Sequence, residues 1–221
     1  MFTKKRLTLF CGHYGSGKTN IAVNAAISLK EKYDNVALAD LDIVNPYFRT
    51  KDSSELLAEK GIRLICSSYA NSNVDIPALP QDMYAITDDK SLRCVLDIGG
   101  DDRGALVLGR ISDKIKEEND YEMLMVINSF RPLTRDTAST MEVLSEIETA
   151  AKMKFTGLVN NSNLGEETTA EDVLNSLCYA EDVSKATGLP VVATTVKAEL
   201  YDALRDKVDN LFKMTLQDKI L

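Results

Sequence analysis

The sequence contains few of the residues from which proteins build metal sites. Its 221 residues include one histidine and four cysteines, and the cysteines form no Cys-x-x-Cys pair. Structural zinc and iron–sulfur sites take closely spaced cysteines and histidines as ligands. We therefore expect no such site within one chain, although one cysteine from each of two subunits could bind a metal between them. Cys11, Cys66 and Cys94 lie in or beside apolar runs, which predicts buried thiols in a reducing compartment.

Long apolar runs and an excess of positive charge are also lacking. No run approaches the ~18 apolar residues of a membrane span, and none resembles the apolar core of a secretory signal. The chain carries 26 Lys and Arg against 34 Asp and Glu, a net charge of −8. This balance disfavours a dedicated nucleic-acid surface, which usually shows as a basic patch. We expect a cytoplasmic protein without membrane association.

The chain also shows no internal repeat and no linker. At this length we expect a single domain spanning residues 1–221. Short apolar runs bounded by Gly, Asp or Asn alternate with segments of helical period, as is typical of strands buried on both faces of a parallel sheet. The runs are Leu7–Cys11, Val36–Asp40, Ile62–Cys66, Cys94–Ile98, Met123–Asn128, Phe155–Asn160 and Val191–Thr194. They predict a doubly wound, three-layer α/β/α fold with about seven mostly parallel strands.

Helices are predicted between several of these runs. The segment Lys18–Lys32 is apolar almost all round, which predicts a buried helix. Thr169–Asp172 has the pattern of a capping box opening another helix, which Gly188 would close. A further helix is predicted from apolar residues at every third position, namely Ala138, Met141, Leu144 and Ile147. The tail from Glu199 is predicted to form an amphipathic helix that packs on the sheet.

A phosphate-binding motif follows the first apolar run. Residues Gly12–Thr19 fit the pattern GxxxxGK[ST] between a predicted strand and a predicted helix. Glycines let successive backbone N–H groups point at phosphate oxygens, and the helix directs its positive end at the same anion. Lys18 is predicted to pair with the β- and γ-phosphates, and the Thr19 hydroxyl to bind Mg²⁺. The predicted nucleotide contacts are Gly12, Gly15, Ser16, Gly17, Lys18, Thr19 and Asn20.

Acidic residues end two other predicted strands. Asp97 ends an apolar strand and is predicted to hold a Mg²⁺-bound water, and Gly100, three residues later, to offer its N–H to the γ-phosphate. Asp40 and Asp42 lie at the tip of the strand that follows the phosphate loop. Their spacing allows both carboxylates to face the Mg²⁺ site.

These three motifs in this order resemble the MinD/ParA branch of P-loop ATPases, the CobQ/CobB/MinD/ParA nucleotide-binding family, over most of the chain. The resemblance implies ATP or ADP and Mg²⁺ as ligands, with slow ATP hydrolysis. It implies that Asp42 positions the attacking water while Lys18 neutralises phosphate charge, and that Asp40 supports Mg²⁺ indirectly. The implied nucleotide-responsive segments are Asp42–Phe48 and Asp97–Gly104.

The base-binding residue is predicted from a late strand. GTPases of the translation-factor type carry Asn-Lys-x-Asp there, whereas this chain reads Asn160-Asn161-Ser162-Asn163, without Lys or Asp. The resemblance to the nitrogenase iron protein, a member of this branch, places Asn161 on adenine. An Asn-rich loop is also often only a turn, so both interpretations stay open.

Two further residues, His13 and Arg103, each have two alternative interpretations, and His13 departs from the family pattern. MinD/ParA relatives usually have a lysine, which reaches the nucleotide of the partner subunit, where this chain has His13. His13 either replaces it as a pH-dependent cation or points to solvent, so ATP-dependent dimerisation is expected to be weak. Arg103 either neutralises phosphate or pairs with the neighbouring Asp101 and Asp102.

Three functions compete at this point. The first is a nucleotide-controlled molecular switch that acts on an unknown protein partner. The second is an ATP-dependent enzyme resembling dethiobiotin synthetase or the cobyrinate-amidating enzymes, in which the irregular stretch Asn71–Tyr84 would line a pocket for a small-molecule substrate. The third is a metallochaperone ATPase, which the missing Cys-x-x-Cys pair disfavours.

Overall fold

The described elements form one parallel sheet. The computed structural model describes residues 4–42, 54–66, 81–99 and 102–216. Its eight-stranded sheet has the order β3-β2-β4-β1-β5-β6-β7-β8, and every neighbouring pair is parallel. The strands are β1 Leu7–Cys11, β2 Val36–Asp40, β3 Arg63–Cys66, β4 Arg93–Asp97, β5 Tyr121–Ile127, β6 Gly157–Asn160, β7 Val191–Lys197 and β8 Leu211–Met214. The predicted doubly wound α/β fold is confirmed.

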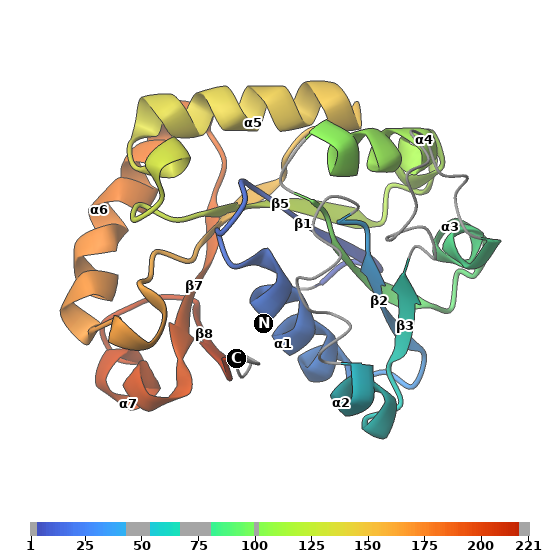
Figure 1. Ribbon diagram of the computed structural model, residues 1–221, viewed down its shortest axis with the longest axis horizontal. Helices are drawn as coiled ribbons and strands as arrows, with labels where there is room; N and C mark the ends of the chain where they lie inside the picture. The colour runs from blue at the N-terminus through green and yellow to red at the C-terminus, as the bar shows by residue number, and fades with distance from the viewer. Residues whose placement is uncertain (1–3, 43–53, 67–80, 100–101, 217–221) are drawn as a thin grey trace.

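Helices cover both faces of this sheet (Figure 1). The α-helices are α1 Lys18–Lys30, α2 Ser54–Glu59, α3 Ala85–Asp88, α4 Asp102–Glu118, α5 Thr137–Ala151, α6 Ala170–Thr187 and α7 Tyr201–Leu204. Buried side chains of α3, α4, α5 and α6 share one apolar cluster with the sheet. Those of α1 and α2 share a second cluster on the opposite face. The arrangement is therefore three-layered, as predicted.

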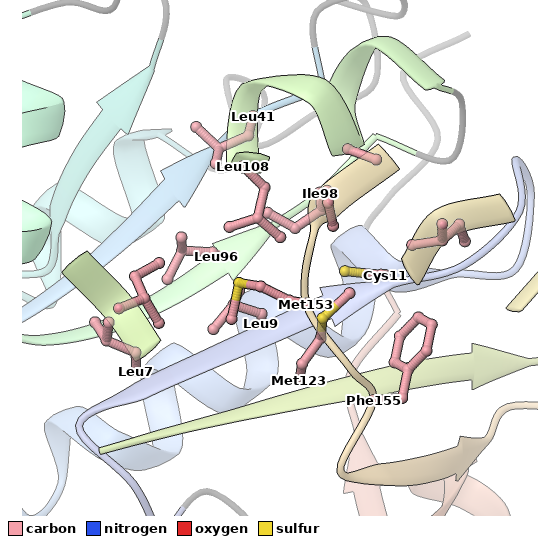
Figure 2. Close-up of a cluster of buried hydrophobic side chains, with 14 of the residues drawn as sticks. Leu7, Leu9, Cys11, Leu41, Leu96, Ile98, Leu108, Met123, Met153 and Phe155 are labelled. Atoms are coloured by element: carbon pink, nitrogen blue, oxygen red, sulfur yellow. The ribbon is translucent and has the colours of Figure 1, made fainter. Parts of the chain in front are cut away.

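The first strand shows why the strand runs are mostly apolar. Leu7, Leu9 and Cys11 point into the cluster beneath α4 and α5, where Figure 2 shows them beside Met123. Phe10 points the other way, into the cluster with α1. Successive side chains of a strand face opposite sides of the sheet, so a strand covered on both sides is apolar at most positions. The exception in β1, Thr8, is buried with its hydroxyl donating to Glu122 Oε1 at 2.9 Å.

The helix predicted from the three-residue apolar repeat is confirmed as α5, but only part of that repeat packs against the sheet. Ile147 is buried and Leu144 packs against the same apolar cluster. Met141 is 42% exposed and Ala138 is also exposed. The side chains that α5 buries are those of Thr140, Val143, Ile147 and Ala151. An α-helix turns about 100° per residue, so a strict three-residue repeat drifts by about 60° at each step and leaves the packed face within two turns. The true stripe follows the mean period of 3.6 residues.

The predicted helical tail is wrong. The chain forms only the short helix α7 and then adds β8 to the edge of the sheet beside β7, with Thr194 opposite Leu211. Asn210, directly before β8, has a φ of 52°, a left-handed conformation that turns the chain into the strand. Leu204 and Val208 still pack in an apolar cluster with Val173 of α6. The sheet therefore has eight strands rather than the predicted seven.

The remaining local predictions have mixed outcomes. α6 begins at a capping box in which Thr169 and Asp172 exchange hydrogen bonds, and ends at Gly188 with a φ of 74°, as predicted. Cys11 and Cys94 are buried as predicted, whereas Cys66 is exposed because it lies on the edge strand β3. Among the described residues, no helix has both the length and the apolar character required to cross a membrane.

Candidate functional site

The phosphate-binding motif lies between β1 and α1, at the C-terminal edge of the sheet. Gly12 has a φ of 150°, and a Cβ atom there would lie 2.5 Å from the backbone oxygen of Val126. Gly17 has a φ of 89°, and a Cβ there would lie 2.1 Å from Nδ2 of Asn161. Both positions therefore require glycine, because a side chain would collide with the neighbouring strand ends. The conformation of the loop therefore depends on the close packing around these two glycines as well as on their backbone freedom.

Lys18 brings a buried positive charge into the loop. Its side chain is on the buried side of α1, at 6% exposure, and its Nζ donates a hydrogen bond to the backbone oxygen of His13 at 3.2 Å. The ammonium group therefore lies across the inside of the loop, near the start of α1. A cation at a helix N-terminus makes an anion the favoured ligand of this position.

Thr19 and Asp97 meet beside Lys18. The Thr19 hydroxyl donates to Oδ2 of Asp97 at 2.6 Å, and the carboxylate is 1% exposed. Burial raises the pKa of Asp97 to about 6, although Lys18 and the Thr19 hydrogen bond act in the opposite direction. The charge of Asp42 is a smaller cause that also contributes to this raised pKa. The pair predicted from the sequence to bind Mg²⁺ is thus assembled in space.

Two buried polar atoms of this site have no hydrogen-bond partner among the described residues. They are Oγ of Ser16 and Oδ1 of Asp97. Buried polar atoms in proteins are nearly always paired, and these two belong to residues that the sequence assigned to phosphate and Mg²⁺. The arrangement fits a ligand that donates to a carboxylate, as metal-bound water does, and that approaches a hydroxyl, as phosphate does.

The acidic pair of β2 lies next to Asp97. Strand register places Asp40 directly opposite Asp97, and Leu41 N donates to the Asp97 backbone oxygen at 2.9 Å. Oδ1 of Asp40 accepts from the backbone N–H of Asp42 at 3.0 Å, which fixes the start of the segment that carries Asp42. The three acids therefore gather at the tips of β2 and β4, as predicted. Residues 43–48 of the predicted responsive segment lie outside the described residues.

A close contact joins the end of β4 to the start of α4. A Cβ atom on Gly104 would lie 2.7 Å from both N and Cα of Gly99, and one on Gly99 would lie 3.1 Å from Oδ1 of Asp42. Both glycines lie in the predicted responsive segment Asp97–Gly104, but the sequence gives no sign that they contact each other. Gly100 and the side chain of Arg103 lie outside the description, so their predicted roles stay predictions.

Asn161 fastens the phosphate loop to the neighbouring strands. Its side chain is 2% exposed, and Nδ2 donates to the backbone oxygen of Ser16 at 2.5 Å. Its Oδ1 accepts a hydrogen bond from the Thr195 hydroxyl of β7. Both ends of the amide are therefore engaged within the protein. The predicted contact with adenine is left to the second N–H of the amide, and it stays a prediction.

A second asparagine organises the loop after β5. Asn128 is 1% exposed, and its Oδ1 accepts from the backbone N–H groups of Phe130 at 3.0 Å and Asn163 at 3.4 Å. The sequence offered one signal for this residue, an asparagine ending an apolar run. The interactions link the loops that follow β5 and β6, both of which border the phosphate loop.

Comparisons with known proteins agree with the fold. No protein-family model matches the chain, and no curated protein matches it. Among solved structures, the cell division protein FtsY of Thermotoga maritima has a TM-score of 0.55 at 20% identity over 86% of this chain and 61% of its own. FtsY of Mycoplasma mycoides has a TM-score of 0.53 at 17% identity over 86% and 59%. The signal recognition particle receptor FtsY of Elizabethkingia anophelis, solved in complex with GDP, has a TM-score of 0.51 at 18% identity over 87% and 58%.

These similarities define a fold class. The chain spans about three fifths of the length of the FtsY structures it matches. At such identities the likeness concerns the fold, which is that of P-loop NTPases. The neighbours do not single out the MinD/ParA branch, so that resemblance continues to depend on the sequence motifs alone.

Proposed function

We propose that the chain is a Mg²⁺-dependent ATP-binding protein of the MinD/ParA type, with slow ATPase activity that controls a conformational switch. One observation carries the proposal. The buried Lys18 ammonium, the Thr19–Asp97 pair and two unpartnered buried oxygens converge on one P-loop. Each is a group that phosphate or hydrated Mg²⁺ satisfies, and each belongs to a residue selected by the sequence motif.

The donor set fits Mg²⁺ bound together with a nucleotide. Mg²⁺ usually takes one or two protein oxygens and completes its octahedron with phosphate oxygens and water. Thr19 offers a hydroxyl oxygen and Asp97 a carboxylate at the same place. The described residues hold no group of three or more His, Cys, Asp or Glu side chains suited to a metal, and a nucleotide-linked Mg²⁺ needs none. When bound, the ion would neutralise charge on the phosphates.

The remaining functions of the site are assigned to individual residues of this chain. Lys18 stabilises the negative charge of the phosphates in the ground state and in the transition state. Asp42 is half-buried at the end of β2, where its backbone N–H is held by Asp40. From there it orients the water that attacks the γ-phosphate. Asp97, whose Oδ1 has no partner among the described residues, would help to hold a hydrated Mg²⁺ ion by accepting a hydrogen bond.

Adenine rather than guanine is proposed on the sequence of the loop after β6. The residues Asn160–Asn163 lack the lysine and aspartate of the guanine-reading motif. The GDP in a neighbouring structure is a property of that FtsY protein. The irregular stretch offered as a substrate pocket is described only from residue 81, and nothing in the described part favours the small-molecule enzyme over the switch.

The contact between Gly99 and Gly104 supports a switch. Asp42, Gly99 and the first turn of α4 are packed together without intervening side chains. A shift of the β4 loop toward a γ-phosphate would therefore be transmitted to α4, a 17-residue helix on the outer layer. We propose that a partner protein binds differently to the two positions of α4, and the sequence does not identify this partner.

Two substitutions test the proposed division of roles. Lys18→Ala is expected to abolish nucleotide binding, because it removes a ground-state contact. Asp42→Ala is expected to change the Kd for Mg·ATP by less than about threefold while lowering kcat at least about tenfold, because its contribution belongs to the transition state. Titration calorimetry and phosphate-release assays measure the two quantities. If Asp42→Ala lost binding as severely as Lys18→Ala, the proposed roles would be wrong.

A further inference from the structure

The loop between β5 and α5 is held by hydrogen bonds within itself and to the loop after β6. Besides the interactions of Asn128 described above, Thr134 Oγ1 donates to the Asn128 backbone oxygen at 2.8 Å. The backbone N–H of Ser129 donates to the Ser162 hydroxyl at 3.0 Å, and that of Arg131 to the Asn128 backbone oxygen at 3.1 Å. Such a dense set of hydrogen bonds fixes the backbone from which Arg131 projects. Fixing a loop in this way lowers the entropic cost of placing one side chain.

Arg131 places its guanidinium group directly on the phosphate loop. From the position that a Cβ atom would take on Gly15, the distances are 3.5 Å to Cζ and Nε and 3.8 Å to Cδ of Arg131. The absence of a side chain at Gly15, whose φ is 76°, leaves the loop backbone open to this contact. The guanidinium therefore lies beside the loop whose N–H groups are proposed to bind phosphate.

The charge of Arg131 is not used elsewhere in the described part of the chain. Its exposed side chain forms no hydrogen bond or ion pair with another described residue. Other arginines have such partners, since Arg6 pairs with Glu118 and Arg135 with Asp136 at 3.4 Å. A guanidinium binds phosphate through paired N–H groups with favourable geometry. A rigid loop that presents an unpaired guanidinium to a phosphate site has the chemistry of an additional anion contact.

We propose that Arg131 is a further nucleotide-binding residue, which contacts the phosphates of the bound nucleotide from the Gly15 side of the loop. The inference rests on the proposed nucleotide binding and extends it to a residue outside the P-loop motif. Lys18 approaches the phosphates from the buried side and Arg131 from the solvent side. Together they compensate the charge that a diphosphate brings to a chain of net charge −8.

The test compares Arg131 with an arginine four residues further along the chain. Mg·ADP, which is not hydrolysed, is titrated by calorimetry into the full chain and into the variants Arg131→Ala, Arg131→Lys and Arg135→Ala. Charge-assisted hydrogen bonds to phosphate predict a Kd about tenfold higher for Arg131→Ala and a smaller increase for Arg131→Lys. Arg135→Ala is expected to stay within about twofold of the wild type. The effect of Arg131→Ala should shrink at about 0.5 M salt, where exposed charges are screened.

The outcomes separate this inference from the proposed function. Melting temperatures without nucleotide should be equal for the wild type and Arg131→Ala, because the side chain is exposed, whereas ADP should raise the melting temperature of the variant by less. An Arg131→Ala protein that binds ADP as the wild type does overturns the inference and leaves the proposed function standing. An equal loss in Arg135→Ala also overturns it, since the effect would then be one of general charge. A wild-type protein that binds neither ADP nor GDP overturns both.

Discussion

At the scale of single residues, Asp97 combines two opposing demands. In the proposed role its carboxylate is ionised and accepts a hydrogen bond from metal-bound water, yet the residue is 1% exposed and one of its oxygens is unpartnered among the described residues. Burial of a charge that is only partly compensated is unfavourable. The nucleotide-free protein is therefore strained electrostatically at the place where Mg²⁺ and phosphate are proposed to bind.

The raised pKa of Asp97, about 6, predicts the direction of a pH effect. The unfolded value is about 3.9, so between these values the folded chain holds the proton more tightly than the unfolded chain. Nucleotide-free protein should lose stability as the pH rises through about 6. Urea unfolding in EDTA at pH 5 and pH 8 should show that the wild type loses about 1 kcal/mol more than Asp97→Asn. Equal losses in both proteins would show that Asp97 is ionised at pH 5.

Asn161 has two alternative roles, as a structural clamp on the phosphate loop or as a contact to adenine. As a clamp, it holds the Ser16 carbonyl and accepts from Thr195. Asn161→Ala would remove the side-chain donor of the Ser16 carbonyl and leave the Thr195 hydroxyl only its 3.4 Å hydrogen bond to the Asn160 backbone oxygen. We therefore expect it to lower the free energy of unfolding by about 1–3 kcal/mol and to weaken ADP and GDP binding by similar factors. Thr195→Val keeps the bond to Ser16 and should have the smaller effect. Chemical denaturation and nucleotide titrations measure both quantities. A selective loss of ADP binding by Asn161→Ala would instead establish the adenine contact.

These residues show which parts of the candidate site can be predicted from the sequence. The phosphate-loop residues and Asp97 could be predicted because a fixed chemistry at fixed spacing leaves a local pattern. Asn161 was predicted as a site residue, but its hydrogen bonds to Ser16 and Thr195 join residues 145 and 34 positions apart, which no local pattern encodes. The positions of Arg131 and Asn128 beside the phosphate loop depend on loops that follow different strands, so the proposed role of Arg131 could be inferred only from the folded chain.

At the scale of elements, the strands were easier to predict than the helical faces. Burial on both sides makes most positions of a central strand apolar, and this pattern can be recognised without knowledge of the neighbouring elements. The face of α5 depends on which partner the helix meets, and a three-residue apolar repeat was mistaken for it. In the tail, Leu200, Leu204 and Val208 have a helical spacing, yet pairing with the open edge of β7 makes a strand of the residues that follow. Tertiary context decided both cases.

The junction of β4 and α4 predicts an unusual response to Gly104→Ala. Alanine normally stabilises a helix position by about 1 kcal/mol relative to glycine. Here the added methyl group would lie 2.7 Å from the backbone of Gly99, so we expect a net loss of about 1–3 kcal/mol and slower ATP hydrolysis. Thermal denaturation and a phosphate-release assay measure the two effects. As a control, Gly165→Ala meets no atom within 4 Å, although its φ of 69° also disfavours alanine. A Gly104→Ala protein more stable than the wild type would contradict the close contact.

At the scale of the whole molecule, the site lies where the order of the sheet changes direction. β1 carries the phosphate loop and is flanked by β4 on one side and β5 on the other. Loops from the two halves of the sheet therefore diverge around β1, and ligands of open α/β sheets bind at such points. This topology explains why Asp97 and Arg131, from opposite sides of β1, reach the same loop.

The most direct test of the central claim is a calorimetric titration of the full chain with ADP and GDP, each with Mg²⁺ and with EDTA. The account predicts a micromolar or lower Kd for Mg·ADP, at least about tenfold weaker binding of Mg·GDP, and a clear loss of ADP affinity in EDTA. Lys18→Ala should give no binding heat under the same conditions. Equal affinities for the two nucleotides would contradict the adenine assignment, and an absence of binding by the wild type with Mg²⁺ would contradict the proposed function itself.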